Sequence, residues 1–207
     1  MALANYTDLL AAINGWLGRG TDMNTIAPDL IALAEAEFNR RLRTIDMEAS
    51  TTIVLTSGVG ALPSDFAGFR SVSLANTRLD QVELQTILDI PVTFTGTPYI
   101  FAVADGNVIA RPVSSDTLSI YYYQRIPALT SGAPTNWLMT ANPDLYLFGS
   151  LMQAEFYNWN DDRLPLVKAR TDELIDQLNG DVARKRYGSR TLRARSLVSS
   201  SSGRIAA

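Results

Sequence analysis

The sequence contains no cysteine and no histidine. Without cysteine there are no disulfides and no thiolate nucleophiles, and zinc sites built from thiolates or imidazoles are excluded. Histidine is also the side chain that most often acts as a general base near neutral pH. Most familiar hydrolase and transferase triads are therefore excluded, whereas carboxylate chemistry and oxygen-ligand metal sites remain possible.

Long apolar runs are absent as well. No stretch of about 18 apolar residues occurs, so no segment is expected to cross a membrane. The N-terminal sequence MALANYTDLL lacks the basic start and long apolar stretch of a signal peptide. The composition, with 46% hydrophobic and 19% charged residues, is that of a globular protein with one core, or one core plus a small sheet. We expect a protein made in a cytoplasm and used there or in a particle assembled there.

Positive charge is concentrated at the C-terminal end of the chain. The formal net charge is only −3, from 18 basic and 21 acidic residues. The segment 182–207 has no acid and seven basic residues, which are Arg184, Lys185, Arg186, Arg190, Arg193, Arg195 and Arg204. The remaining chain holds 11 basic and 21 acidic residues and has a net charge of −10. This distribution indicates a basic arm on an acidic body.

The first quarter of the sequence has the spacing of two amphipathic helices. The first helix follows Asn5 or Thr7, both suitable N-caps, and ends at Gly18 and Gly20. The second opens near Thr25 and tolerates Pro28 in its first turn. Its apolar stripe is Leu30, Ala34, Phe38 and Leu42, and its other face carries Glu35, Asn39, Arg40 and Arg43. Two such helices joined by a short loop are expected to pack as a hairpin.

The middle of the sequence changes to the spacing of strands. Strands are predicted over residues 51–56, 69–74, 99–103, 107–111 and 117–124. Within 69–74, Phe69, Ser71 and Ser73 are expected to face away from Arg70, Val72 and Leu74. The pair Asp105-Gly106 is typical of a hairpin turn, and a short helix is predicted near residues 81–89. We expect an antiparallel sheet of four to six strands inserted between helices.

Helical spacing returns near the C-terminal end. One helix is predicted to begin at Asn142-Pro143, and another is predicted from about Asp162 to Gly180 with Leu166, Ala169, Leu174 and Leu178 facing inward. The pattern does not decide whether residues 181–187 continue this helix. After Gly188 the isolated residues Leu192, Leu197 and Val198 lie among arginine and serine, too few apolar residues for a core. This segment is interpreted as an extended arm.

Catalytic and ligand-binding patterns are weak. The carboxylates closest in sequence are Asp161 with Asp162 and Glu35 with Glu37, and we interpret them as a helix start and a solvated helix face. The glycines around Arg19 and Val59 lack the strand and helix of a phosphate-binding loop. The run Tyr121-Tyr122-Tyr123 fits a core or subunit interface better than a base-stacking platform, with Tyr122 joining Leu118 and Ile120. No catalytic residue, cofactor or metal site is predicted.

The basic arm allows three interpretations. It is a nucleic-acid tail that neutralises phosphates, a peptide that docks on a protein surface through arginine–carboxylate pairs, or a solvated tail without a function. Composition alone favours the first two about equally. The aliphatic residues Leu192, Leu197 and Val198 favour the protein surface, because side chains of this kind fill small apolar pockets.

Several segments resemble the tailed-phage adaptor, or head–tail connector, family. IAPDLIALAEAEFNRRLR is similar to the second helix of that family, and LPSDF (Leu62 to Phe66) is similar to a short motif before its sheet. GTPYIFAV, DGN, ARP and YYYQRIPALT resemble its hairpins in order. PTNWLMTANPDLYLFGSLMQAEFYNWNDDR is the most specific match and resembles its final helices. Together these segments cover roughly Thr7 to Tyr187.

The resemblance implies a ring, usually of twelve copies, beneath the portal ring of a filled capsid. It implies helices next to the portal, a sheet facing neighbouring subunits and the next tail (stopper or nozzle) protein, and a C-terminal arm that reaches along the portal. DNA would pass through the ring without being read, and the protein would lie in the neck of the virion.

We therefore predict an α+β protein, with a helical bundle, an inserted antiparallel β-sheet domain and an extended C-terminal arm. The predicted boundaries are residues 1–49 for an N-terminal helical hairpin, 50–130 for the sheet, 131–187 for the completing helices and 188–207 for the arm. The residues predicted to contact the portal are Arg184, Lys185, Arg186, Arg190, Leu192, Arg193, Arg195, Leu197 and Val198. The rival hypotheses are a nucleic-acid-binding module that uses the arm, and a carboxylate hydrolase.

Overall fold

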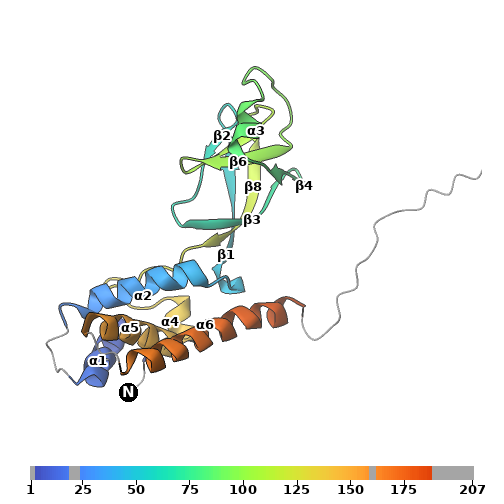
Figure 1. Ribbon diagram of the computed structural model, residues 1–207. Coiled ribbons are helices and arrows are strands. Elements are labelled where there is room, and N and C mark those ends of the chain that lie inside the picture. Colours follow the sequence, from blue (N-terminus) through green and yellow to red (C-terminus); the bar gives the residue numbers. More distant parts are fainter. Residues whose placement is uncertain (1–2, 19–23, 159–161, 188–207) are drawn as a thin grey trace, which may run out of the picture.

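The computed structural model describes residues 3–18, 24–158 and 162–187, and these residues form an α+β fold (Figure 1). Helices α1, α2, α4, α5 and α6 lie together in what we call the helical portion. Strands β1 to β8 and the short helix α3 form the sheet portion, which projects from one side of the helices (Figure 1). The predicted arm, residues 188–207, lies outside the described residues.

The first two helices are those that the sequence predicts. Helix α1 spans Tyr6–Leu17; the side chain of Asn5 accepts a hydrogen bond from the Asp8 amide at 3.0 Å, and Gly18 ends the helix with a φ of 64°. Helix α2 spans Ala27–Arg41 and has Pro28 in its first turn. These caps satisfy backbone groups that a helix end leaves without partners.

The C-terminal helices differ from the prediction in two details and decide a third that the sequence left open. A short helix α4, Trp137–Ala141, precedes α5, Pro143–Asn158, and was not predicted. Helix α6, Leu164–Tyr187, continues through residues 181–187, which answers the question left open by the sequence. The expectation that Leu166 and Ala169 face inward was wrong, because α6 turns Val167, Leu174 and Ile175 to the core and leaves Leu166 76% exposed.

The helices share one apolar core. Phe38 of α2 and Tyr146 of α5 are fully buried and meet edge to face, with ring centroids 5.5 Å apart. Gly149 of α5 lies directly against the Phe38 ring, so the two helices approach closely there. The same core includes Met47, Ile126 and Leu129 from the segments that lead into and out of the sheet portion.

The strands form two four-stranded sheets instead of the single antiparallel sheet that was predicted. One sheet has the order β1-β8-β3-β4 and the other β2-β7-β6-β5. The bounds are β1 Glu48–Val54, β2 Val59–Ala61, β3 Phe66–Leu74, β4 Thr77–Arg78, β5 Asp80–Gln81, β6 Ile100–Ala104, β7 Asn107–Arg111 and β8 Thr117–Gln124, with the 3-10 helix Ile45–Met47 before β1 and α3, Leu84–Leu88, before β6. Strand β5 pairs with β6 in parallel, so the second sheet is mixed.

A second apolar core fills the sheet portion. It includes Ile53, Val72, Phe101, Leu118 and Ile120, all buried. The Asp105-Gly106 turn joins β6 to β7 as predicted, with φ angles of 50° and 69°. The simple alternation expected for residues 69–74 fails, because β3 has register shifts that place both Phe69 and Val72 against this core.

Candidate functional site

The candidate site is the C-terminal end of α6, where the described chain reaches the basic segment. Three residues predicted to contact a partner, Arg184, Lys185 and Arg186, lie on its last turns. This end of α6 runs beside the place where β1 leaves the helical portion (Figure 1). The site therefore lies at the junction between the helices and the sheets.

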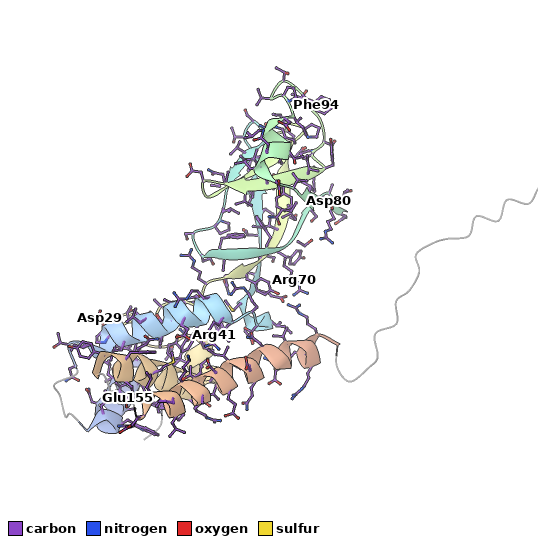
Figure 2. The ribbon with its side chains drawn as sticks, in the orientation of Figure 1. Asp29, Arg41, Arg70, Asp80, Phe94 and Glu155 are labelled. Carbon is purple, nitrogen blue, oxygen red and sulfur yellow. The ribbon has the colours of Figure 1, made fainter. Side chains whose placement is uncertain are left out.

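Arg186 is bonded to the root of the sheet portion. Its guanidinium donates to the carboxylate of Glu48, the first residue of β1, and to the hydroxyl oxygen of Tyr123 on β8 at 3.0 Å. Arg70 of β3 forms a second ion pair with the same Glu48 carboxylate. Arg70 lies on the part of the sheets nearest the helices (Figure 2). Charge-assisted hydrogen bonds of this kind are stronger than neutral ones. Glu48 thus connects three elements, β1, β3 and α6.

The other two basic residues differ in how freely a partner can reach them. The Lys185 ammonium forms an ion pair with Asp46 at 3.1 Å, on the 3-10 helix that precedes β1. The Arg184 side chain is 84% exposed and pairs with Asp181, one helical turn earlier on the same helix, at 3.2 Å. Among these three residues Arg184 is the most accessible to another protein, because Lys185 and Arg186 are less exposed and pair with residues at the root of the sheet portion.

A small cavity of about 190 Å³ lies beside this end of α6. Thr44, Trp137 and Lys185 are among its lining residues. The hydroxyl of Thr44 and the indole nitrogen of Trp137 are buried and have no hydrogen-bond partner among the described residues. The cavity places polar groups next to the start of the basic segment.

The remaining predicted contacts, Arg190, Leu192, Arg193, Arg195, Leu197 and Val198, lie outside the described residues. The partners of the described ones, Asp46, Glu48 and Tyr123, were not identified from the sequence. Arg186 and Glu48 are 138 residues apart, and no local pattern connects residues at that separation.

The carboxylate of Glu35 is buried, which corrects our interpretation of a solvated helix face. It accepts hydrogen bonds from the Leu129 amide at 2.8 Å and from the Tyr146 hydroxyl at 3.0 Å. Burial raises the pKa of Glu35 above its ordinary value, although both hydrogen bonds oppose this rise. Burial, together with the neighbouring Glu35 charge, also raises the pKa of Tyr146. Both groups hold the segment after β8 against α2 and α5.

The other candidate carboxylates do not form a catalytic pair with Glu35. Glu37 is engaged by Arg41 at 3.0 Å on the other side of α2, and Gln153 donates to it at 3.1 Å. Asp162 is exposed before the start of α6, and Asp161 lies outside the described residues. Within the described ranges, no cluster of three or more acidic residues is placed to hold a metal ion.

The tyrosine run is divided between three roles. Tyr122 is buried with Leu118 and Ile120, as predicted, and its hydroxyl donates to Asp65 at 3.1 Å. Tyr123 accepts the hydrogen bond from Arg186, and Tyr121 is 55% exposed. The three rings therefore do not form a stacking platform for bases.

In the part of the chain that the structure describes, none of the helices has the length and apolar character needed to cross a membrane.

Comparison with known proteins identifies the family. No curated protein matches the chain. The family model of the SU10 adaptor protein matches residues 4–195, a range that covers both portions of the fold and the first part of the basic segment. Adaptors of this kind are structural, non-enzymatic components of the phage virion neck, in contact with portal and tail components in general. The chain belongs to the SU10 adaptor protein family and is a phage adaptor protein.

Proposed function

We propose that this adaptor forms a ring, of twelve copies by family resemblance, that joins the portal to the tail and extends the DNA channel. In this proposal the C-terminal segment, residues 188–207, docks each copy on the portal. The family match supports the adaptor role, and the observation that carries the docking proposal is the anchored end of α6.

The anchored end gives the C-terminal segment a fixed starting point. Arg186 and Lys185 hold the last turn of α6 on Glu48 and Asp46, so the segment begins at the junction of the two portions. Nineteen residues follow Gly188, enough to reach roughly 60 Å when extended. A segment of that reach can contact a separate protein ring without any movement of the helices.

The structure changes the roles that we give to the basic residues. Lys185 and Arg186 support the base of the segment, and Arg184 is available to a partner because its side chain is exposed. We assign the portal carboxylates to Arg190, Arg193 and Arg195, and small apolar pockets of the portal to Leu192, Leu197 and Val198. Arginine suits this task because its guanidinium binds carboxylates in a bidentate manner.

The far end of the sheet portion supplies a surface for the next tail component. Phe94 lies at the end of the sheets farthest from the helices (Figure 2), and it is 53% exposed. Leu88, Val92 and Tyr99 from the same stretch of chain are also more than half exposed. Large apolar side chains gathered at one end of a protein are typical of a protein–protein contact. The portal and the tail partner would then bind different parts of the subunit.

Deletion of residues 189–207 tests the docking proposal. The shortened chain should fold, because both apolar cores lie within the described residues, and it should no longer join portal rings in a pull-down. The matched control is Phe94→Ser, which changes the opposite end and should leave portal joining intact.

A second pair of variants separates specific arginine contacts from chain length. Replacing Arg190, Arg193 and Arg195 with serine should weaken joining, whereas replacing the four serines 199–202 with alanine should not. Joining by the chain that lacks residues 189–207 at wild-type strength would refute the docking proposal. Binding to duplex DNA with a steep salt dependence, lost with the segment, would favour the nucleic-acid interpretation instead.

A further inference from the structure

A groove of about 580 Å³ runs along the side of α2 that faces the sheet portion. Its walls include Ala36 and Arg40 of α2, Arg43 shortly after α2, Phe66 at the start of β3, and Arg125 and Ala128 in the segment after β8. The lining thus combines small alanine side chains with three arginines. The groove is separate from the end of α6 that we assign to portal docking.

The three arginines of the groove, Arg40, Arg43 and Arg125, lack salt-bridge partners within the part of the chain that the structure describes. The Arg43 guanidinium donates to the carbonyl oxygens of Asn39 and Leu42, at 2.9 and 2.5 Å, and the Arg43 backbone amide donates to the Asn179 side chain of α6 at 3.0 Å. The one carboxylate in the groove wall, Glu35, already accepts hydrogen bonds from Leu129 and Tyr146. The groove therefore presents uncompensated positive charge on a body whose net charge, without residues 182–207, is −10. Such a surface attracts an acidic group from outside the chain.

The chain carries an acidic face on α6. Asp172, Glu173, Asp176 and Asp181 lie along one side of this helix, and Ala169 and Gly180 keep the helix backbone between them accessible. The side chains of Asp172, Glu173 and Asp181 are 35%, 53% and 47% exposed. Arg184 lies at the end of this face and pairs with Asp181, while Arg41 and Arg170 pair with Asp172 and Glu173. Asp176 has no ion pair among the described residues, and the four carboxylates outnumber these three arginines, so the face keeps a small net negative charge.

The residues of the acidic face do not line the groove of their own chain. Arg41 of α2 pairs with Asp172 at 2.5 Å, so the acidic face lies toward the side of α2 that carries Glu37 and Arg41. Arg40 of α2 and Arg43, two residues after α2 ends, instead line the groove together with Phe66 of the sheet portion. Two complementary surfaces on different sides of one subunit fit a head-to-tail contact between copies.

We propose that the arginine groove of one copy (Arg40, Arg43 and Arg125) binds the acidic face of α6 (Asp172, Glu173, Asp176 and Asp181) of the next copy. The contact is heterologous, so each copy uses its groove on one neighbour and its α6 on the other. Repetition of such a contact produces a closed ring when the rotation between copies divides the circle evenly. This inference rests on the proposed ring and names the surfaces that would build it.

Charge reversal on each surface tests the contact. A groove variant, Arg40→Glu with Arg125→Glu, and a helix variant, Glu173→Arg with Asp176→Arg, should each assemble at least about ten-fold more weakly than the wild type, because like charges then meet. The measurement is native mass spectrometry of the full chain over a concentration series, alone and with portal rings. Arg78→Glu, a charge reversal at an exposed site on β4, is the matched control and should assemble as the wild type does.

A mixture of the two variants provides the decisive result. In a mixture, each glutamate groove can meet an arginine helix, and each wild-type groove can meet a wild-type helix. Assembly should therefore return in rings whose two variants alternate, which a simple folding defect in either variant would not allow.

The outcomes separate this inference from the proposed ring. If the two variants assemble like the wild type, or if mixing restores nothing, the groove contact is wrong while the ring stands. If the wild type stays monomeric both alone and on portal rings, the ring and the contact are both refuted. If the groove variant loses affinity for duplex DNA and assembles normally, the groove binds nucleic acid and the inference is wrong.

Discussion

The helical portion and the sheet portion bury their apolar residues in different ways. The core of the helices takes residues from Leu9 to Ile175, so both ends of the chain must come together before it exists. Among the described residues, the buried members of the sheet core come from the stretch between Ile53 and Tyr122. Between the two cores lie polar contacts, among them Arg186 with Glu48 and Glu35 with Leu129. The helical core therefore needs contacts between residues far apart in the sequence, whereas the sheet core is built from one continuous stretch of chain.

Two truncations of buried side chains are expected to have the largest effect and to show whether the two portions unfold independently. Phe38→Ala should cost about 3–5 kcal/mol and Ile120→Ala about 2–5 kcal/mol, because each removes a fully buried side chain and leaves a cavity. Hydrogen exchange should show that the first change exposes amides of α2 and α5 and spares β6 and β7, and that the second does the opposite. An equal loss of protection in both portions would mean that the two cores unfold as one unit.

A glycine in the helical core gives a second test of how tightly the helices pack. A Cβ at position 149 would lie 2.8 Å from Cε1 of Phe38, so Gly149→Ala should destabilise the helical portion by about 1–3 kcal/mol. Gly15→Ala is the matched control on α1, since its Cβ would meet nothing within 4 Å. The control should stabilise the chain by about 0.5–1 kcal/mol through helix propensity. Thermal unfolding of both variants checks the signs, and a neutral Gly149→Ala would show that α5 can shift away from α2.

The smallest expected effect concerns pH and the polar contacts between the cores. Burial raises the pKa of Glu35 above its ordinary value of 4.5. At pH values between 4.5 and the raised pKa, the folded chain therefore binds more protons than the unfolded chain. The stability of the wild type should therefore fall, relative to Glu35→Gln, as the pH rises above 4.5. Glutamine keeps an oxygen that accepts from Leu129 and Tyr146 but has no proton to lose. Urea unfolding at several pH values measures the difference, and parallel curves for the two proteins would contradict it.

Local patterns predicted those parts of the fold that local residues decide. Asn5, Gly18 and Pro28 mark the ends of α1 and α2, and Asp105-Gly106 marks a hairpin, because each acts on its own few backbone groups. Strands β2, β4 and β5 have only two or three residues each, which is too short for a recognisable alternation. Their absence from the prediction is why one sheet was expected where two exist.

The candidate site shows the same limit. The basic residues at the end of α6 are visible in the composition, but their partners Asp46 and Glu48 come from a segment about 140 residues away. Glu35 was placed on a polar face because its neighbours Asn39 and Arg40 are polar. Leu129 and Tyr146, which bury it, reach α2 only through the tertiary fold.

The shared carboxylate of Glu48 has a mechanical consequence. Strand β1 begins at this residue, Arg70 holds it from β3, and Arg186 holds it from the helix that precedes the C-terminal segment. A load applied to that segment is delivered through α6 to the point where the sheets are mounted, before it reaches the interior of either portion. Tension on the C-terminal segment would therefore act first on the Arg186–Glu48 ion pair and on the orientation of the sheets relative to the helices.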